Sequence, residues 1–128
     1  MSKFDQEDIE EQKTQAENFI SQAEDFLYND KVLAGLKAYN KAMNIYFNIG
    51  SYGKLPDIFY RISQVLSNES KIYQALEYLR QIKDRLHKLD LPEEEAKLSE
   101  AMAKLLFRVG DYYKAADYYG RENLSLLT

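Results

Sequence analysis

Residues 99–119, SEAMAKLLFRVGDYYKAADYY, contain the pattern that decides the fold. Apolar residues recur every three or four positions on both sides of Gly110-Asp111, which predicts two amphipathic helices joined by a tight turn. The same pattern occurs 40 residues earlier in FYRISQVLSNESKIYQALEYL (59–79) and 80 residues earlier in FISQAEDFLYNDKVLAGLKAY (19–39). The sequence therefore predicts three copies of one helix–turn–helix unit.

Six positions keep their character in all three copies. The aligned triplets are Phe19, Phe59 and Ser99; Ala23, Ser63 and Ala103; Phe26, Leu66 and Leu106; Val32, Ile72 and Tyr112; Gly35, Ala75 and Ala115; and Tyr39, Leu79 and Tyr119. The second and fifth triplets contain only small residues, one triplet on each helix of the pair. Small residues at fixed positions let two backbones approach closely, while the large residues fill the layer between pairs.

The rest of the chain continues this all-helical pattern. Loop and start signals at Gly50–Gly53, Pro56, Asp90 and Pro92 separate the apolar stripes, and Asp90 is expected to cap the helix that follows it. The expected helices cover about 5–29, 31–49, 56–68, 71–89, 92–109 and the residues from 111 onward. Six helices with short connections predict three antiparallel pairs in one domain, residues 1–128, with repeats at about 16–55, 56–95 and 96–128.

At these aligned positions the chain resembles the tetratricopeptide repeat family. The family pattern of small and aromatic residues is matched by Ala23, Phe26, Gly35 and Tyr39 in the first copy, and Gly110-Asp111-Tyr112 matches its favoured turn. The period of 40 residues is longer than the usual one of about 34, and Glu122 stands where a small residue is expected. The resemblance implies a right-handed solenoid of αα-hairpins, which is an architecture that typically binds other proteins.

The resemblance also implies a concave groove lined by the first helix of each pair. The residues of the candidate peptide groove are Glu24, Tyr28, Tyr60, Arg61, Gln64, Lys97, Lys104, Phe107 and Arg108. A peptide or helix of a partner protein, with matching charge, is the expected ligand. Glu24 and Gln64 stand where Asn is expected in family members that clamp a C-terminal carboxylate, so we do not expect that clamp here.

Few side chains suit catalysis or metal binding. The chain has no Cys and one His, His87, which shares a helix face with Asp84 but has too few potential ligands around it for a metal site. Glu93, Glu94 and Glu95 are explained by the positive end of the helix dipole. We therefore expect a non-catalytic protein without a metal or cofactor; a helical-bundle enzyme or cofactor protein is the least favoured alternative.

The charge distribution disfavours nucleic-acid binding. The net charge is −4, of which residues 1–30 contribute −7 and the remaining residues +3. Nucleic-acid binding needs a basic face, and the acidic N-terminus is unlike a secretory signal. No apolar run approaches the roughly 18–20 residues that cross a bilayer. We expect a cytoplasmic protein that binds neither nucleic acid nor membrane.

The C-terminal end is expected to be apolar and without a capping helix. Its expected contact residues are Tyr113, Tyr118, Leu124, Leu126 and Leu127. Another copy of the chain, a partner, or residues of a longer protein would cover this surface. An oligomerisation module, or a fragment of a longer solenoid, is therefore the alternative to the peptide-binding scaffold.

Overall fold

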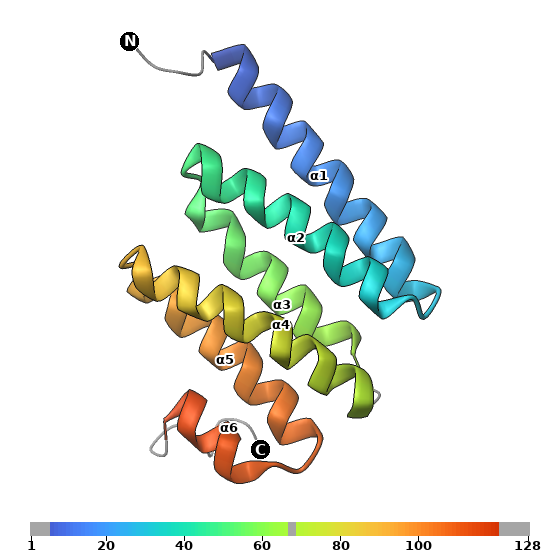
Figure 1. Cartoon of the computed structure of the whole chain (residues 1–128), viewed down its shortest axis with the longest axis vertical. Helices are drawn as coiled ribbons and strands as arrows, with labels where there is room; N and C mark the ends of the chain where they lie inside the picture. The colour runs from blue at the N-terminus through green and yellow to red at the C-terminus, as the bar shows by residue number, and fades with distance from the viewer. Residues whose placement is uncertain (1–5, 67–68, 121–128) are drawn as a thin grey trace. The chain divides into compact units, whose positions relative to one another are not determined.

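The structure is a computed structural model that describes residues 6–66 and 69–120. Within these residues the chain forms six α-helices, one short 3-10 turn and no strand (Figure 1). The elements are α1 Gln6–Tyr28, α2 Val32–Ile49, η1 Tyr52–Lys54, α3 Leu55–Val65, α4 Glu69–Lys88, α5 Pro92–Arg108 and α6 Tyr112–Tyr119. The predicted all-α class and the six predicted helices are confirmed.

The chain divides into two compact units between Ile58 and Phe59, at a position inside α3. The first unit contains α1, α2, η1 and the first turn of α3. The second unit contains the rest of α3 together with α4, α5 and α6. Helix hairpins build each unit, with α1 packed on α2 in the first, and α4 on α5 and α5 on α6 in the second.

Small residues hold the α1–α2 hairpin together. Ala16 and Ala23 of α1 have no exposed surface, and Gly35 of α2 is also buried. A Cβ atom placed on Gly35 would lie 3.2 Å from the carbonyl oxygen of Ala23 and 2.8 Å from Cγ of Leu27. Even a methyl group at position 35 would force its neighbours to move, so this pair fixes how closely the two helices approach.

The larger apolar residues of α1 are less buried than Ala16 and Ala23. Five of them are only half-buried: Ile9, Phe19, Ile20, Phe26 and Leu27. The apolar stripe of α1 therefore has a narrow buried centre of alanines and two partly exposed flanks.

The second unit also buries small residues on two helices that pack together. Ala103 of α5 and Ala115 of α6 have no exposed surface, and these helices pack on each other. Ser63 and Ala75 are buried as well, with the Ser63 hydroxyl donating to the Tyr60 carbonyl over 2.7 Å. Long side chains fill the rest of the interior: Ile72, Leu76, Leu79, Leu86, Leu98, Met102, Leu105 and Leu106.

Four helix ends share one turn geometry at regular intervals. The backbone N–H groups of Asp30, Gly50, Asp90 and Gly110 each donate to the carbonyl three residues earlier. The residue that follows each of them donates to the carbonyl five residues earlier, which is the Schellman arrangement. All four residues have positive φ, between 55° and 83°. Because all of these positions differ by multiples of 20 residues, and Gly50 and Asp90 by 40, the helix ends follow the period seen in the sequence.

The structure corrects two details of the sequence-based expectation. Asp90 does not cap α5; the residue before that helix is Leu91, which makes no side-chain cap, and Asp90 itself is the left-handed residue that ends α4. The third helix ends at Val65 rather than near residue 68, and η1 includes the second half of the loop expected at 50–53.

Candidate functional site

The groove residues of the first unit lie near the C-terminus of α1. Glu24 is exposed, and Tyr28 has 90% of its surface accessible to solvent. They share one side of the helix because four residues make slightly more than one turn. Tyr28 is the most exposed of the large hydrophobic side chains in the described residues, which makes it available to a ligand.

Two tyrosines of α2, Tyr39 and Tyr46, have hydroxyl pKa values that are raised by burial and by acidic side chains of the same unit. Tyr39 is fully buried, and burial, with a smaller effect of the Asp57 carboxylate, raises the pKa of its hydroxyl to about 12. Burial also raises the pKa of Tyr46, with Glu17 and Asp57 adding to the effect. The Tyr39 hydroxyl has no hydrogen-bond partner in the described structure. Neither tyrosine was identified from the sequence as more than a core residue.

In the second unit, α3 contributes three of the predicted groove residues. Tyr60 is 55% exposed and Gln64 is exposed, and they follow each other at a spacing of one turn. Arg61 is half-buried and takes part in a polar interaction. An exposed aromatic ring beside an amide offers a ligand both apolar contact and hydrogen bonding.

The groove residues of α5 form a line along that helix. Lys97 is exposed, and Lys104 is half-buried with its ammonium 3.5 Å from the Glu100 carboxylate. The Phe107 ring packs against the Tyr112 ring of α6, with 5.0 Å between the centroids. Phe107 therefore stabilises the α5–α6 hairpin in addition to being a candidate ligand contact.

Arg108 joins α3 to α5. One guanidinium nitrogen donates to the Ser63 carbonyl over 2.8 Å and also to the Leu66 carbonyl. These carbonyls lie at the end of α3, where helical partners are missing. Arg108 therefore has a structural role, because its side chain links α5 to the end of α3. Seven of the nine groove residues lie on these two helices: Tyr60, Arg61, Gln64, Lys97, Lys104, Phe107 and Arg108.

Lys83, His87 and Glu95 form a polar cluster between α4 and α5 that the sequence analysis missed. The Glu95 carboxylate accepts from the Lys83 ammonium over 2.7 Å and lies 3.2 Å from Nδ1 of His87. The hydrogen bond from Lys83, and then that from His87, lowers the pKa of Glu95. His87 therefore contacts Glu95 rather than acting with Asp84. No group of three or more His, Asp or Glu side chains that could hold a metal ion is found in residues 6–66 and 69–120.

The predicted C-terminal contact surface is described only in part. Tyr113 is 80% exposed, whereas Tyr118 is half-buried, and its interaction with Arg80 of α4 raises the pKa of that guanidinium. Leu124, Leu126 and Leu127 lie outside the described residues.

Comparison of the chain with protein-family models, curated proteins and solved structures gives no match. Among the described residues, none of the helices has the length and apolar character needed to cross a membrane.

Proposed function

We propose that this chain is a tetratricopeptide-like repeat scaffold of the cytoplasm that binds a peptide or helical segment of a partner protein and catalyses no reaction. Two repeated features support the repeat architecture. The first is the contact between small residues, as at Ala23 and Gly35. The second is the left-handed turn that recurs at positions 30, 50, 90 and 110.

The observation that carries the binding proposal is the pair of bonded helices α3 and α5. Arg108 fixes the end of α3 against α5, so that a ligand would meet a pre-organised surface. Tyr60 and Gln64 on α3, with Lys97 and Lys104 on α5, offer an aromatic ring, an amide and two cations. Such a surface favours a peptide that carries acidic and apolar residues.

Selection from a random 16-residue peptide display library tests this function without assuming a sequence. We expect peptides that bind the folded chain with dissociation constants at or below about 10⁻⁴ M. Raising the salt should weaken binding, because exposed charge pairs are screened over about 8–10 Å. Failure to recover any peptide that also binds in solution would contradict the proposal.

The alternative function is self-association through the C-terminal end, and the 80% exposure of Tyr113 favours it. In that case Tyr113→Ser would make the protein more monomeric in sedimentation velocity without weakening any selected peptide. The same variant distinguishes the two functions.

A further inference from the structure

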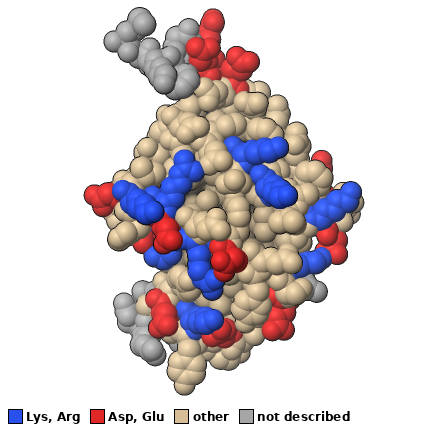
Figure 2. All heavy atoms as spheres, in the orientation of Figure 1, with Lys and Arg blue, Asp and Glu red and all other residues tan. Residues whose placement is uncertain are grey.

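The lysines of α2 form a basic face on the first unit. Residues 31–56 contain Lys31, Lys37, Lys41 and Lys54 and no Asp or Glu, whereas residues 59–128 carry eleven basic and eleven acidic residues. The net charge of +3 carried by residues 31–128 therefore comes entirely from the first unit. Figure 2 shows basic side chains, without acidic ones among them, over the middle of α2.

Lys37 and Lys41 stand out because they are exposed and have no carboxylate partner among the described residues. In the second unit, Lys83, Lys104 and Lys114 each lie within 4.0 Å of a carboxylate. Two ammonium groups that lie one helical turn apart and have no carboxylate partner attract an acidic group from outside the unit.

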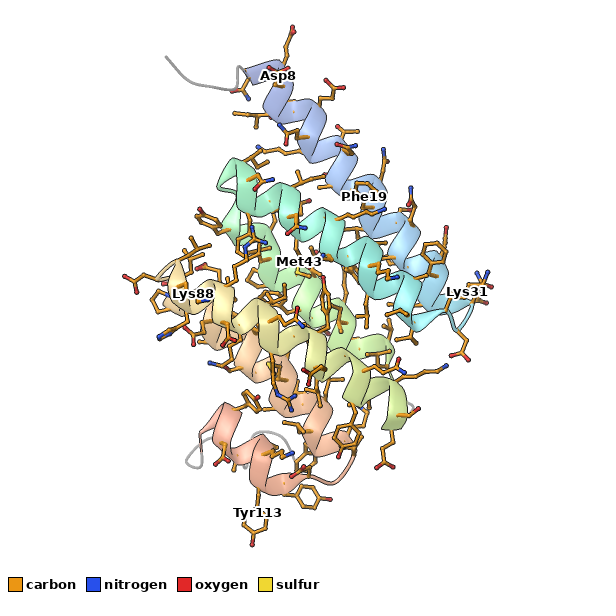
Figure 3. All side chains as sticks on the ribbon, in the orientation of Figure 1. Asp8, Phe19, Lys31, Met43, Lys88 and Tyr113 are labelled. Carbon is orange, nitrogen blue, oxygen red and sulfur yellow. The ribbon has the colours of Figure 1, made fainter. Side chains whose placement is uncertain are left out.

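Apolar residues surround these lysines. Leu33, one turn before Lys37, is 62% exposed. The Lys41 ammonium lies 5.5 Å from the centroid of the Phe19 ring. Phe19 belongs to α1 (Figure 3) and is half-buried. We call Phe19, Leu33, Lys37 and Lys41 the basic face. It combines charge with apolar area, as helix-binding surfaces do.

The opposite flank of α1 is acidic. Glu10, Glu17 and Glu24 are exposed and recur every seven residues, so that they form one line along the helix. Glu17 is displaced from Phe19 by about 200° around the helix axis, because each residue turns the helix by about 100°. We call these three residues the acidic flank. The first unit therefore has complementary charges on two different sides.

We propose that the basic face of one copy of the chain binds the acidic flank of α1 in a second copy. The two surfaces differ, so the contact is heterologous, and each copy keeps one unused surface of each kind. Association continues beyond the dimer and forms open chains. This partner is additional to the peptide ligand proposed above, whose surface lies on α3 and α5.

Charge complementarity within the chain selects a second copy over nucleic acid or a membrane. An anionic polymer or lipid surface would meet few basic groups on the first unit and would be repelled by the acids of α1. A second copy brings three carboxylates in one line along the side of a helix.

The test uses two charge-reversed variants of the full chain, Lys37→Glu/Lys41→Glu and Glu10→Lys/Glu17→Lys, in sedimentation velocity. In 50 mM NaCl the parent should show an average mass that rises with concentration, and 300 mM NaCl should weaken association about tenfold. Each variant alone should remain monomeric. Their equimolar mixture should associate again, because the first variant keeps the native acidic flank and the second keeps the native basic face.

Control variants carry the same change in net charge elsewhere. Lys88→Glu/Lys114→Glu and Glu11→Lys/Asp25→Lys should associate like the parent, and circular dichroism should show the same helix content for all of them. A parent that stays monomeric at 50 mM NaCl, a mixture that stays monomeric, or equal losses in the control variants would overturn the proposal. If binding to RNA or anionic vesicles depends on Lys37 and Lys41 while self-association does not, the basic face binds a different partner and the proposal is contradicted.

Discussion

The guanidinium of Arg108 donates a hydrogen bond of 2.8 Å to the carbonyl of Ser63, a residue 45 positions earlier in the chain. A second bond from the same nitrogen goes to the carbonyl of Leu66. This side chain, which comes from α5, therefore provides hydrogen-bond donors for carbonyl groups at the end of α3. It links the two helices of the candidate site.

Replacing Arg108 should destabilise the second unit. Arg108→Met keeps the apolar stem but removes both hydrogen bonds, and we expect a loss of about 1 kcal/mol because the side chain is partly solvated. Lys104→Met, one turn away, removes only a partly exposed ion pair and should change stability by less than about 0.5 kcal/mol. Urea unfolding followed by circular dichroism measures both. Equal effects would show that the bonds to Ser63 and Leu66 contribute nothing.

The small-residue contact in the first unit gives a second prediction. Gly35→Ala places a methyl group 2.8 Å from Leu27 and 3.2 Å from the Ala23 carbonyl, so we expect a destabilisation of about 1–3 kcal/mol despite the better helix propensity of Ala. Gly53→Ala is the matched control, because nothing lies within 4 Å of a Cβ atom there. A Gly35→Ala variant that melts at or above the parent temperature would contradict the close approach of α1 and α2.

Substitutions at the left-handed turn positions should change stability in opposite directions at Gly and at Asp. Gly50→Ala and Gly110→Ala should each cost about 1 kcal/mol, since φ is 74° and 83° there. Asp90→Gly should be neutral or stabilising by up to about 1 kcal/mol, because Asp90 holds φ at 55°. Thermal unfolding at pH 7 measures the three variants. Stabilisation by Gly110→Ala would be incompatible with the observed turn.

The Glu95 cluster gives a prediction for the dependence of stability on pH. Lys83 and His87 lower the pKa of Glu95 in the folded state, so its contribution is present above the pKa of the unfolded chain and is lost as the pH falls through the folded value. Glu95→Gln should therefore reduce stability at pH 6–7 by less than about 1 kcal/mol and have no effect near pH 2. Urea midpoints at both pH values test this. An effect that persists unchanged at the lower pH would show that the role of Glu95 is not electrostatic.

Much of the fold could be predicted because the repeat places similar residues at similar positions. Gly35 and Ala115 are small where two helices touch, and this local rule needs no knowledge of distant partners. The left-handed conformation of Asp30 and Asp90 was missed because Asp is also a common N-cap. An Asp in a turn therefore suggests the start of the next helix rather than the end of the preceding one. A glycine at either position would have indicated a left-handed helix end.

The candidate site was less predictable, because side-chain partners come from residues far apart in sequence. Arg108 was expected to face a ligand, yet its guanidinium binds carbonyl oxygens of α3, and carbonyl groups carry no sequence signal. Lys83 likewise binds a partner that the sequence spacing does not indicate, the Glu95 carboxylate 12 positions later. Lys88 is therefore the better control in charge-reversal experiments.

The central claim, that α3 and α5 form a peptide-binding surface, is tested most directly by the affinity of one selected peptide for two matched double variants. Tyr60→Ala/Lys104→Glu changes the surface, whereas Tyr73→Ala/Lys88→Glu makes the same changes on exposed residues of α4. Fluorescence polarisation should show at least a tenfold loss of affinity for the first variant, about 1.4 kcal/mol, and less than about a twofold change for the second. Equal losses in both variants, or no loss in the first, would contradict the account.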